Sequence, residues 1–213
     1  MIPLTTEEQK IVDDFFKLFE RKGCQRFNTW RGVVMIKTPF DQARYHQIIH
    51  DTRPDVIVEC GTFNGGSALF FLDTMKICGI DGLVLSIDRS IFARRPREAG
   101  IEYISSNTIN RGTVAQIAKR VTGKRVMVVL DSDHHKDHVL REIWLYKDLV
   151  SSGCYMVVED GCVNNNPVFP DYGPGPSEAI TEFMKTNNEF IQDKDIEDLF
   201  LLTYHPKGWL KKK

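Results

Sequence analysis

Several features that would place a protein in a special class are missing from this sequence of 213 residues. Its five cysteines form no C-x-x-C pair, and their odd number favours free thiols over a disulfide framework. The N-terminus, MIPLTTEEQK, lacks the apolar segment of a signal peptide. No apolar run approaches the roughly 20 residues that a membrane-spanning helix needs. The formal net charge of −1 indicates no nucleic-acid surface. We therefore expect a cytoplasmic protein that binds neither membranes nor nucleic acids.

Both common phosphate-binding motifs are also absent from the most glycine-rich stretch, DVIVECGTFNGGSAL at residues 55–69. The dinucleotide fingerprint G-x-G-x-x-G would need a glycine where Phe63 stands. The P-loop would need a lysine where Ser67 stands. The glycines therefore need another explanation than either motif.

The rest of the chain alternates between strands and helices. Short, mostly apolar runs, typical of strands, occupy residues 56–60, 83–88, 101–106, 125–131 and 155–160. Amphipathic segments at about 66–77, 110–122 and 136–150 separate them. This alternation predicts one α/β domain over residues 1–213, with a mostly parallel central sheet and helices on both faces. Hydrophobic residues make up 42% of the chain, which is enough for a full core.

The ends of the chain carry further elements. Thr5 and Glu8 have the spacing of a capping box at the start of a helix, and residues 41–52 read as a second helix. We expect residues 1–54 to form a helical extension. Residues 161–179 are a long loop rich in Asn, Gly and Pro, which leads into a helix at 177–187. Residues 190–211 are expected to form two strands joined by a charged turn.

Polar residues cluster where the predicted strands end. Loops at the carboxyl ends of parallel strands form the ligand sites of doubly wound sheets. The residues at these ends are Glu59, Gly61, Gly65, Gly66, Ser67, Asp88, Ser105, Ser106, Asn107, Asp131, Asp133, Glu159 and Asp160. A single Asp or Gly there could be a turn or cap residue, but five strand ends that meet at one rim indicate a functional site.

The first strand end has the pattern E-x-G-x-x-x-G-x-S. Its glycines let the backbone approach a ligand, and the Glu59 carboxylate suits an ammonium group, although it could instead cap the turn. Asp88, one strand later, suits the hydroxyls of a ribose. Together these features predict S-adenosylmethionine as the cofactor. The predicted contacts are Glu59, Gly61, Thr62, Gly65, Gly66, Ser67, Asp88, Ser106, Asn107 and Asp131.

Three longer stretches carry a family resemblance. VIVECGTFNGGSALFF, VVLDSDHHKDHVLREIWLYKDLVSSGCYMVVED and PDYGPGPSEAI resemble the cephalosporin hydroxylase/rhamnosyl O-methyltransferase family. The similarity extends from about residue 28 to the end of the sequence. It implies a Rossmann-like methyltransferase fold that binds S-adenosylmethionine and Mg²⁺. Because the family name includes a hydroxylase, membership alone does not fix the reaction.

A divalent cation fits the acids after the fourth and fifth strands. Asp131, Glu159 and Asp160 are similar in placement to the metal ligands of catechol-type O-methyltransferases. Three hard oxygen ligands without a thiolate suit Mg²⁺, Mn²⁺ or Ca²⁺ rather than zinc. A shifted alignment would make Asp133 the ligand in place of Asp131. The alternative without a metal is that Glu159 and Asp160 merely cap a loop.

The sequence DHHKDH supplies candidates for acid–base chemistry, namely His134, His135 and Lys136. His134 is expected near the adenine or the metal, and His135 and Lys136 near the acceptor. Lys136 matches the lysine base of catechol-type enzymes only in the shifted alignment. The same residues are also unremarkable at the solvent-facing start of a helix.

The long loop after Asp160 is expected to cover the acceptor pocket, because loops of this length in compact domains tend to be functional. Asn164, Asp171 and Tyr172 are its predicted substrate contacts.

The sequence thus predicts a cation-assisted O-methyltransferase that acts on a hydroxyl of a small sugar or natural product, and the enzyme is expected to form a homo-oligomer. One alternative is a cephalosporin-hydroxylase-like component or a non-haem iron oxygenase, with His135, Asp137 and His205 as iron ligands. Another is a cofactor-binding protein without catalytic activity.

Overall fold

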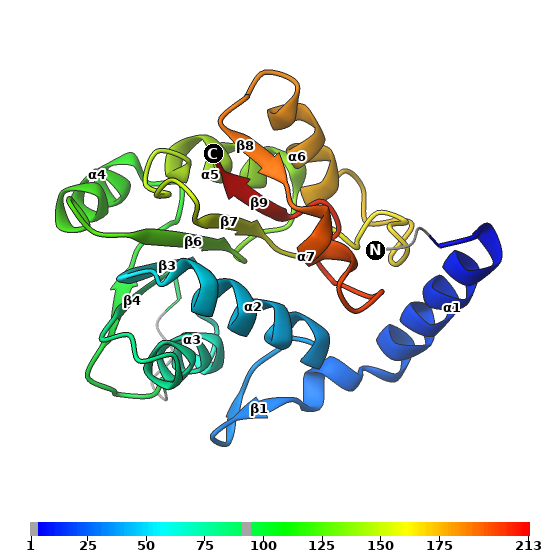
Figure 1. Cartoon of the computed structure of the whole chain (residues 1–213), viewed down its shortest axis with the longest axis horizontal. Helices are drawn as coiled ribbons and strands as arrows, with labels where there is room; N and C mark the ends of the chain where they lie inside the picture. Colours follow the sequence, from blue (N-terminus) through cyan, green and yellow to red (C-terminus); the bar gives the residue numbers. More distant parts are fainter. Residues whose placement is uncertain (1–3, 91–94) are drawn as a thin grey trace.

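The computed structural model describes residues 4–90 and 95–213, and a seven-stranded sheet forms its centre (Figure 1). The strands are β3 (Val56–Cys60), β4 (Leu83–Asp88), β5 (Ile101–Ser105), β6 (Val126–Leu130), β7 (Tyr155–Val158), β8 (Phe190–Gln192) and β9 (Trp209–Lys212). Their spatial order is β5-β4-β3-β6-β7-β9-β8. The first five are parallel, and β9 runs antiparallel to both neighbours. The predicted mostly parallel sheet is confirmed, and the five predicted strands agree with the structure to within two residues at each end.

Helices cover both faces of the sheet, as predicted (Figure 1). One face packs against α4 (Arg111–Arg120), α5 (Lys136–Tyr146) and α6 (Pro176–Met184). The other face packs against α2 (Pro39–Thr52), α3 (Gly66–Ile77) and α7 (Lys194–Asp198). Side chains of β3 alternate between the two faces, with Val56 and Val58 in one core and Ile57 in the other. No helix in the described ranges is both long and apolar enough to cross a membrane.

The N-terminal stretch contains α1 (Thr6–Lys22), a short 3₁₀ helix (Cys24–Phe27) and a hairpin of β1 (Thr29–Trp30) and β2 (Val33–Val34). The capping box of Thr5 and Glu8 is present at the start of α1. Helix α1 projects from the side of the molecule (Figure 1). The following helix, α2, is instead part of the main body and covers the sheet.

The C-terminal prediction was incomplete. Between β8 and β9 lies the helix α7 rather than a simple charged turn. The Asp193 side chain caps this helix by accepting a hydrogen bond from the backbone N–H of Ile196, and Ile196 is buried against the sheet. The charged residues that suggested a turn therefore occupy the exposed side of a short helix, which tertiary packing stabilises.

Arg44, on α2, fastens the C-terminal segment to the core. Its guanidinium is fully buried and donates to three backbone carbonyls, those of Ile196, Glu197 and Leu202, at 2.8–2.9 Å. Its charge is balanced by Asp41 at 3.4 Å, which also accepts a hydrogen bond of 2.6 Å from Thr203. A buried charge of this kind is tolerated only while its partners stay in place.

We expect Arg44→Leu to lower the free energy of unfolding by about 3–5 kcal/mol, because the change leaves the buried Asp41 charge and three carbonyls without their partner. Urea denaturation monitored by circular dichroism measures this loss. The control is Arg21→Leu, which alters an exposed arginine on α1. A loss for Arg44→Leu that matches this control would contradict the assigned role.

Candidate active site

The glycine turn after β3 lies where the strand order reverses, between β4 and β6. Gly61 has a φ of +97°, and a Cβ atom there would lie 1.7 Å from the carbonyl oxygen of Asp131. A Cβ atom on Gly66 would lie 2.3 Å from the carbonyl oxygen of Val34. Both positions therefore require glycine for contacts between backbone segments. Close approach of the backbone to a ligand was predicted for these glycines, and the structure adds close approach between two backbone segments.

Asp88, at the end of β4, shapes the same turn. Its Oδ2 accepts hydrogen bonds from two consecutive backbone N–H groups of the turn at 3.0 and 3.1 Å. Asn107, after β5, lines the first of two cavities at this edge of the sheet, as expected of an adenine contact. Ser106 instead bonds to Thr113 on α4 at 2.7 Å and lines neither cavity described below. The ribose role of Asp88 stays a prediction.

Two adjoining cavities, of about 290 and 380 Å³, open at the carboxyl ends of the strands. Gly61, Asp88 and His134 lie in the walls of both. Of the other predicted residues, the first cavity is lined by Asn107, Asp133, His135 and Tyr172, and the second by Thr62, Gly66, Ser67, Asp131 and Asp160. The shared wall residues place the two cavities side by side at this edge of the sheet.

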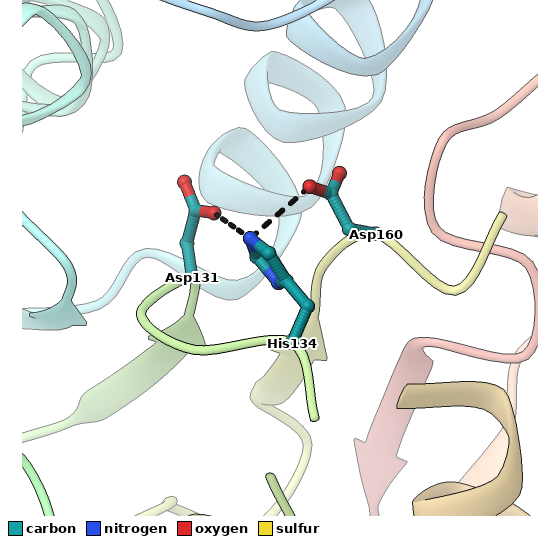
Figure 2. A group of neighbouring side chains, drawn as sticks. All are labelled: Asp131, His134 and Asp160. Carbon is teal, nitrogen blue, oxygen red and sulfur yellow. Dashed lines mark ion pairs between the residues drawn. The ribbon is translucent and has the colours of Figure 1, made fainter. Parts of the chain in front are cut away.

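Asp131, His134 and Asp160 meet at the centre of this site (Figure 2). Nε2 of His134 lies 3.2 Å from Oδ2 of Asp160 and 3.8 Å from Oδ1 of Asp131. One ligand atom from each of the three lies within 4.8 Å of the others, close enough to share an ion. Asp133, the alternative to Asp131, lies outside this group and pairs with His135 at 2.7 Å.

Lys37, which lies just before the N-terminus of α2, was not among the site residues predicted from the sequence. Its Nζ lies 2.5 and 2.7 Å from the two oxygens of Glu159 and 3.1 Å from Oδ2 of Asp131. Tyr45 donates a further hydrogen bond of 2.5 Å to Glu159. Glu159, predicted as a metal ligand, thus lies buried beside the group of Figure 2 and faces Lys37. The only sequence signal was a single lysine after the apolar residues VVMI.

Burial and neighbouring charges shift the pKa values of Glu159 and Asp131 in opposite directions. Burial raises the pKa of Glu159, but the ammonium of Lys37, together with other neighbours such as the Tyr45 hydroxyl, outweighs burial and holds the pKa at about 2. Burial and the neighbouring Glu159 raise the pKa of Asp131 well above its usual value. Lys37 therefore stabilises the charged form of Glu159. The charged form of Asp131 needs a further positive charge nearby.

Glu59 lies deeper in the core than predicted for a cofactor contact. It is part of β3, is fully buried and lines neither cavity. Its Oε2 accepts a hydrogen bond of 2.5 Å from Ser86. Burial raises its pKa to about 7, against the lowering effect of Lys37. Near neutral pH this carboxyl group can therefore gain or lose its charge according to what binds above it.

Two of the three candidate acid–base residues lie at the edge of the site. Lys136 forms an ion pair of 2.6 Å with Glu182 on α6 and lines neither cavity. His135 is largely exposed, and its ring stacks on Tyr172 with the ring centroids 5.4 Å apart. Of the three, only His134 faces Asp131 and Asp160, so the geometry favours it as the acid–base group.

The long loop places one of its three predicted contacts at the site. Tyr172 lines the first cavity. Asn164 donates a hydrogen bond of 3.1 Å to Glu178 and so helps to hold the loop against α6. Asp171 is exposed and lines neither cavity. The predicted contacts of Asn164 and Asp171 with substrate thus have no support from the geometry.

We expect Glu59→Gln to remove part of the pH dependence of stability. Because folding raises the pKa of Glu59 from 4.5 to about 7, its contribution is fully present below pH 4.5 and is lost as the pH rises through 7. Between pH 5 and pH 8, the wild type should lose about 2–3 kcal/mol of unfolding free energy relative to the variant. Urea titrations of the metal-free proteins measure this difference. An unchanged difference at the two pH values would contradict a buried, neutral Glu59.

Comparisons with known proteins show which family this chain belongs to. The family model for Rhamnosyl O-methyltransferase/CmcI matches residues 23–213. Rhamnosyl O-methyltransferase of Mycobacterium tuberculosis (strain ATCC 25618 / H37Rv) is 35% identical over 206 residues, which cover 94% of this chain and 84% of that protein. Its Mycobacterium leprae (strain TN) counterpart is 32% identical over 209 residues, covering 95% and 91%. A CmcI structure named with Mg and SAM is 26% identical and covers 88% of this chain and 77% of its own, with a TM-score of 0.67. The resemblance inferred from the sequence is confirmed, and this chain belongs to the rhamnosyl O-methyltransferase/CmcI family.

Proposed function

We infer that this chain is an S-adenosylmethionine-dependent, Mg²⁺-assisted O-methyltransferase. The observation that carries this inference is the group of Asp131, His134 and Asp160, which lies beside the glycine turn in a sheet of the methyltransferase type. Family membership and the CmcI structure named with Mg and SAM support the same conclusion.

The residues present fit the cofactor. Asp88 and the backbone around Gly61 border both cavities, and Glu59 supplies a buried acid below them. We propose that Asp88 binds the ribose hydroxyls and that the cofactor's ammonium group draws negative charge onto Glu59. The bound cofactor would supply an activated methyl group. The backbone contact between Gly61 and Asp131 brings the cofactor turn next to the acids at the end of β6.

The donor set also fits a hard divalent cation, since Asp131 and Asp160 offer carboxylate oxygens and the group contains no thiolate. We propose these two as ligands, keep Glu159 as the predicted third and leave His134 outside the ligand set, so that its Nε2 stays free for a proton. The cation would lower the pKa of an acceptor hydroxyl and hold it in place. His134 would then take the hydroxyl proton on Nε2, and Asp160, 3.2 Å away, would stabilise the resulting imidazolium.

The oxygenase alternative finds no support. It requires His135, Asp137 and His205 to share an ion. Among residues 4–90 and 95–213, the only group close enough to do so is that of Asp131, His134 and Asp160. His205 is buried, and its Nδ1 accepts a hydrogen bond of 3.1 Å from the backbone N–H of Asp160.

We propose a hydroxyl of a sugar or natural product as the acceptor, which the names of the relatives support. The loop at 161–175 would border it through Tyr172.

A homo-oligomer in the cytoplasm remains our proposal. Apolar side chains on α1 are exposed, among them Ile11 at 64% and Phe15 at 46%, and this supports association through that helix.

The cation proposal predicts a metal-dependent melting temperature. Millimolar Mg²⁺ should raise the melting temperature of the wild type, because a ligand bound only by the native state stabilises it. Asp160→Ala should lose this rise and most methyl transfer, yet bind S-adenosylhomocysteine with nearly unchanged affinity in calorimetry. If Mg²⁺ and Ca²⁺ leave the wild-type melting temperature unchanged and EDTA leaves activity unchanged, the acids are structural and the cation mechanism is wrong.

The base proposal makes a separate prediction. His134→Gln should lower kcat by about 10²–10⁴-fold, because the acceptor proton loses its recipient. Its KM for S-adenosylmethionine and the Mg²⁺ effect on melting should change little. His50→Gln, an exposed change on α2, is the matched control. Steady-state kinetics at saturating Mg²⁺ measure both constants. An unchanged kcat argues against His134 as the base.

A further inference from the structure

Lys37 holds a position between two acids of the proposed cation site. Its Nζ contacts both oxygens of Glu159, at 2.5 and 2.7 Å, and Oδ2 of Asp131, at 3.1 Å. The other Asp131 oxygen, Oδ1, faces His134. Asp131 therefore divides its two oxygens between a cationic side chain of the protein and the group of Figure 2 that could hold a metal ion.

Lys37 is placed as a cation among acids. Its Nζ lies within 3.1 Å of three carboxylate oxygens, two on Glu159 and one on Asp131. An ammonium that donates to these oxygens supplies positive charge and hydrogen bonds, and it has no lone pair with which to act as the base of a methyl transfer.

The surroundings show why a fixed charge is needed here. Four carboxyl groups, those of Glu59, Asp131, Glu159 and Asp160, gather at the ends of β3, β6 and β7, and Lys37 is the lysine among them. Its side chain is only 1% exposed, so water screens its attraction to the acids very little. The same low screening applies to its repulsion of any divalent cation bound by Asp131.

We propose that Lys37 is a built-in counter-ion of the cation site, which holds Asp131 and Glu159 in place before the cation binds and sets how weakly the cation is held. When the cation is absent, Lys37 supplies the positive charge that these acids need. When the cation binds, its charge and that of Lys37 would share Asp131. The site therefore holds the cation less tightly than it would without Lys37. This inference rests on the proposed cation-assisted function.

The decisive consequence is the sign of the effect on cation binding. A merely structural ion pair would stabilise the fold, and its loss would loosen the cation ligands and weaken cation binding. A counter-ion that competes with the cation has the opposite effect, because its removal leaves the carboxylates available and more negative. Loss of the Lys37 charge should therefore tighten cation binding while it destabilises the metal-free protein.

The test compares Lys37→Gln, which keeps a hydrogen-bond donor without the charge, with Lys37→Arg, which keeps the charge. Lys76→Gln, an exposed change on α3, is the control for loss of one positive charge. Mg²⁺ is titrated by calorimetry into the metal-free full chain saturated with S-adenosylhomocysteine, and melting temperatures are measured with and without Mg²⁺.

We expect Lys37→Gln to bind Mg²⁺ at least tenfold more tightly than the wild type, to melt lower without Mg²⁺ and to gain more from Mg²⁺. Lys37→Arg and Lys76→Gln should stay within threefold of the wild-type affinity. Equal or weaker Mg²⁺ binding by Lys37→Gln overturns the inference. If this variant folds only with Mg²⁺, its recovery along a Mg²⁺ series supports the inference, and failure to recover at any concentration overturns it.

The wild type separates failure of the inference from failure of the proposed function. If the wild type shows no Mg²⁺ effect on melting and no loss of activity in EDTA, the cation-assisted function fails, and the Lys37 inference fails with it. If the wild type responds to Mg²⁺ and Lys37→Gln binds it with wild-type affinity, only the Lys37 inference fails.

Discussion

The neutralisation of buried negative charge is the constraint on which this active site depends. Parallel strands deliver their carboxyl ends to one edge of the sheet, and here β3, β6 and β7 bring acids to that edge. Like charges in a poorly hydrated place repel each other strongly unless positive charge lies among them. The protein meets part of this need with Lys37, and the rest is what makes the site suitable for a cation.

The scaffold around the acids is built to keep them in place. Asp160 has a φ of +54°, an uncommon backbone conformation for a residue other than glycine. Its N–H donates to His205, which lies in the segment that Arg44 and Asp41 fasten to α2. The direction of the Asp160 side chain thus depends on contacts that begin on α2.

Residues 1–54, expected as an extension, contribute directly to the site. Lys37, just before α2, and Tyr45, within α2, both contact Glu159. The second cavity is also lined by the segment 34–37. The N-terminal part beyond α1 is therefore integral to the site, and the acceptor would meet it as well as the sheet.

The glycine turn has a structural purpose besides ligand binding. Gly61 and Gly66 permit backbone contacts with the segments that carry Asp131 and Val34. These contacts bring the cofactor turn, the acids and the N-terminal segment together. A larger residue at either position would push apart the parts of the site that must act on the same molecules.

The sequence by itself determined the strands, the mostly parallel sheet and the positions of Asp88, Asp131 and Asp160, because each of these follows from short-range patterns of apolar runs and the residues that end them. It placed His134 near the adenine or the metal and the other two near the acceptor. It could not tell which of His134, His135 and Lys136 faces the acids, since all three lie in one polar stretch and only packing turns them in different directions.

Only the tertiary structure decided the partners of the buried charges. Lys37 meets acids 94 and 122 residues later in the chain, and no local pattern encodes such a pairing. The depth of Glu59 likewise depends on how the neighbouring strands and helices cover β3. The physical reason is that ion pairs and burial depend on distance in space, whereas a sequence pattern records only distance along the chain.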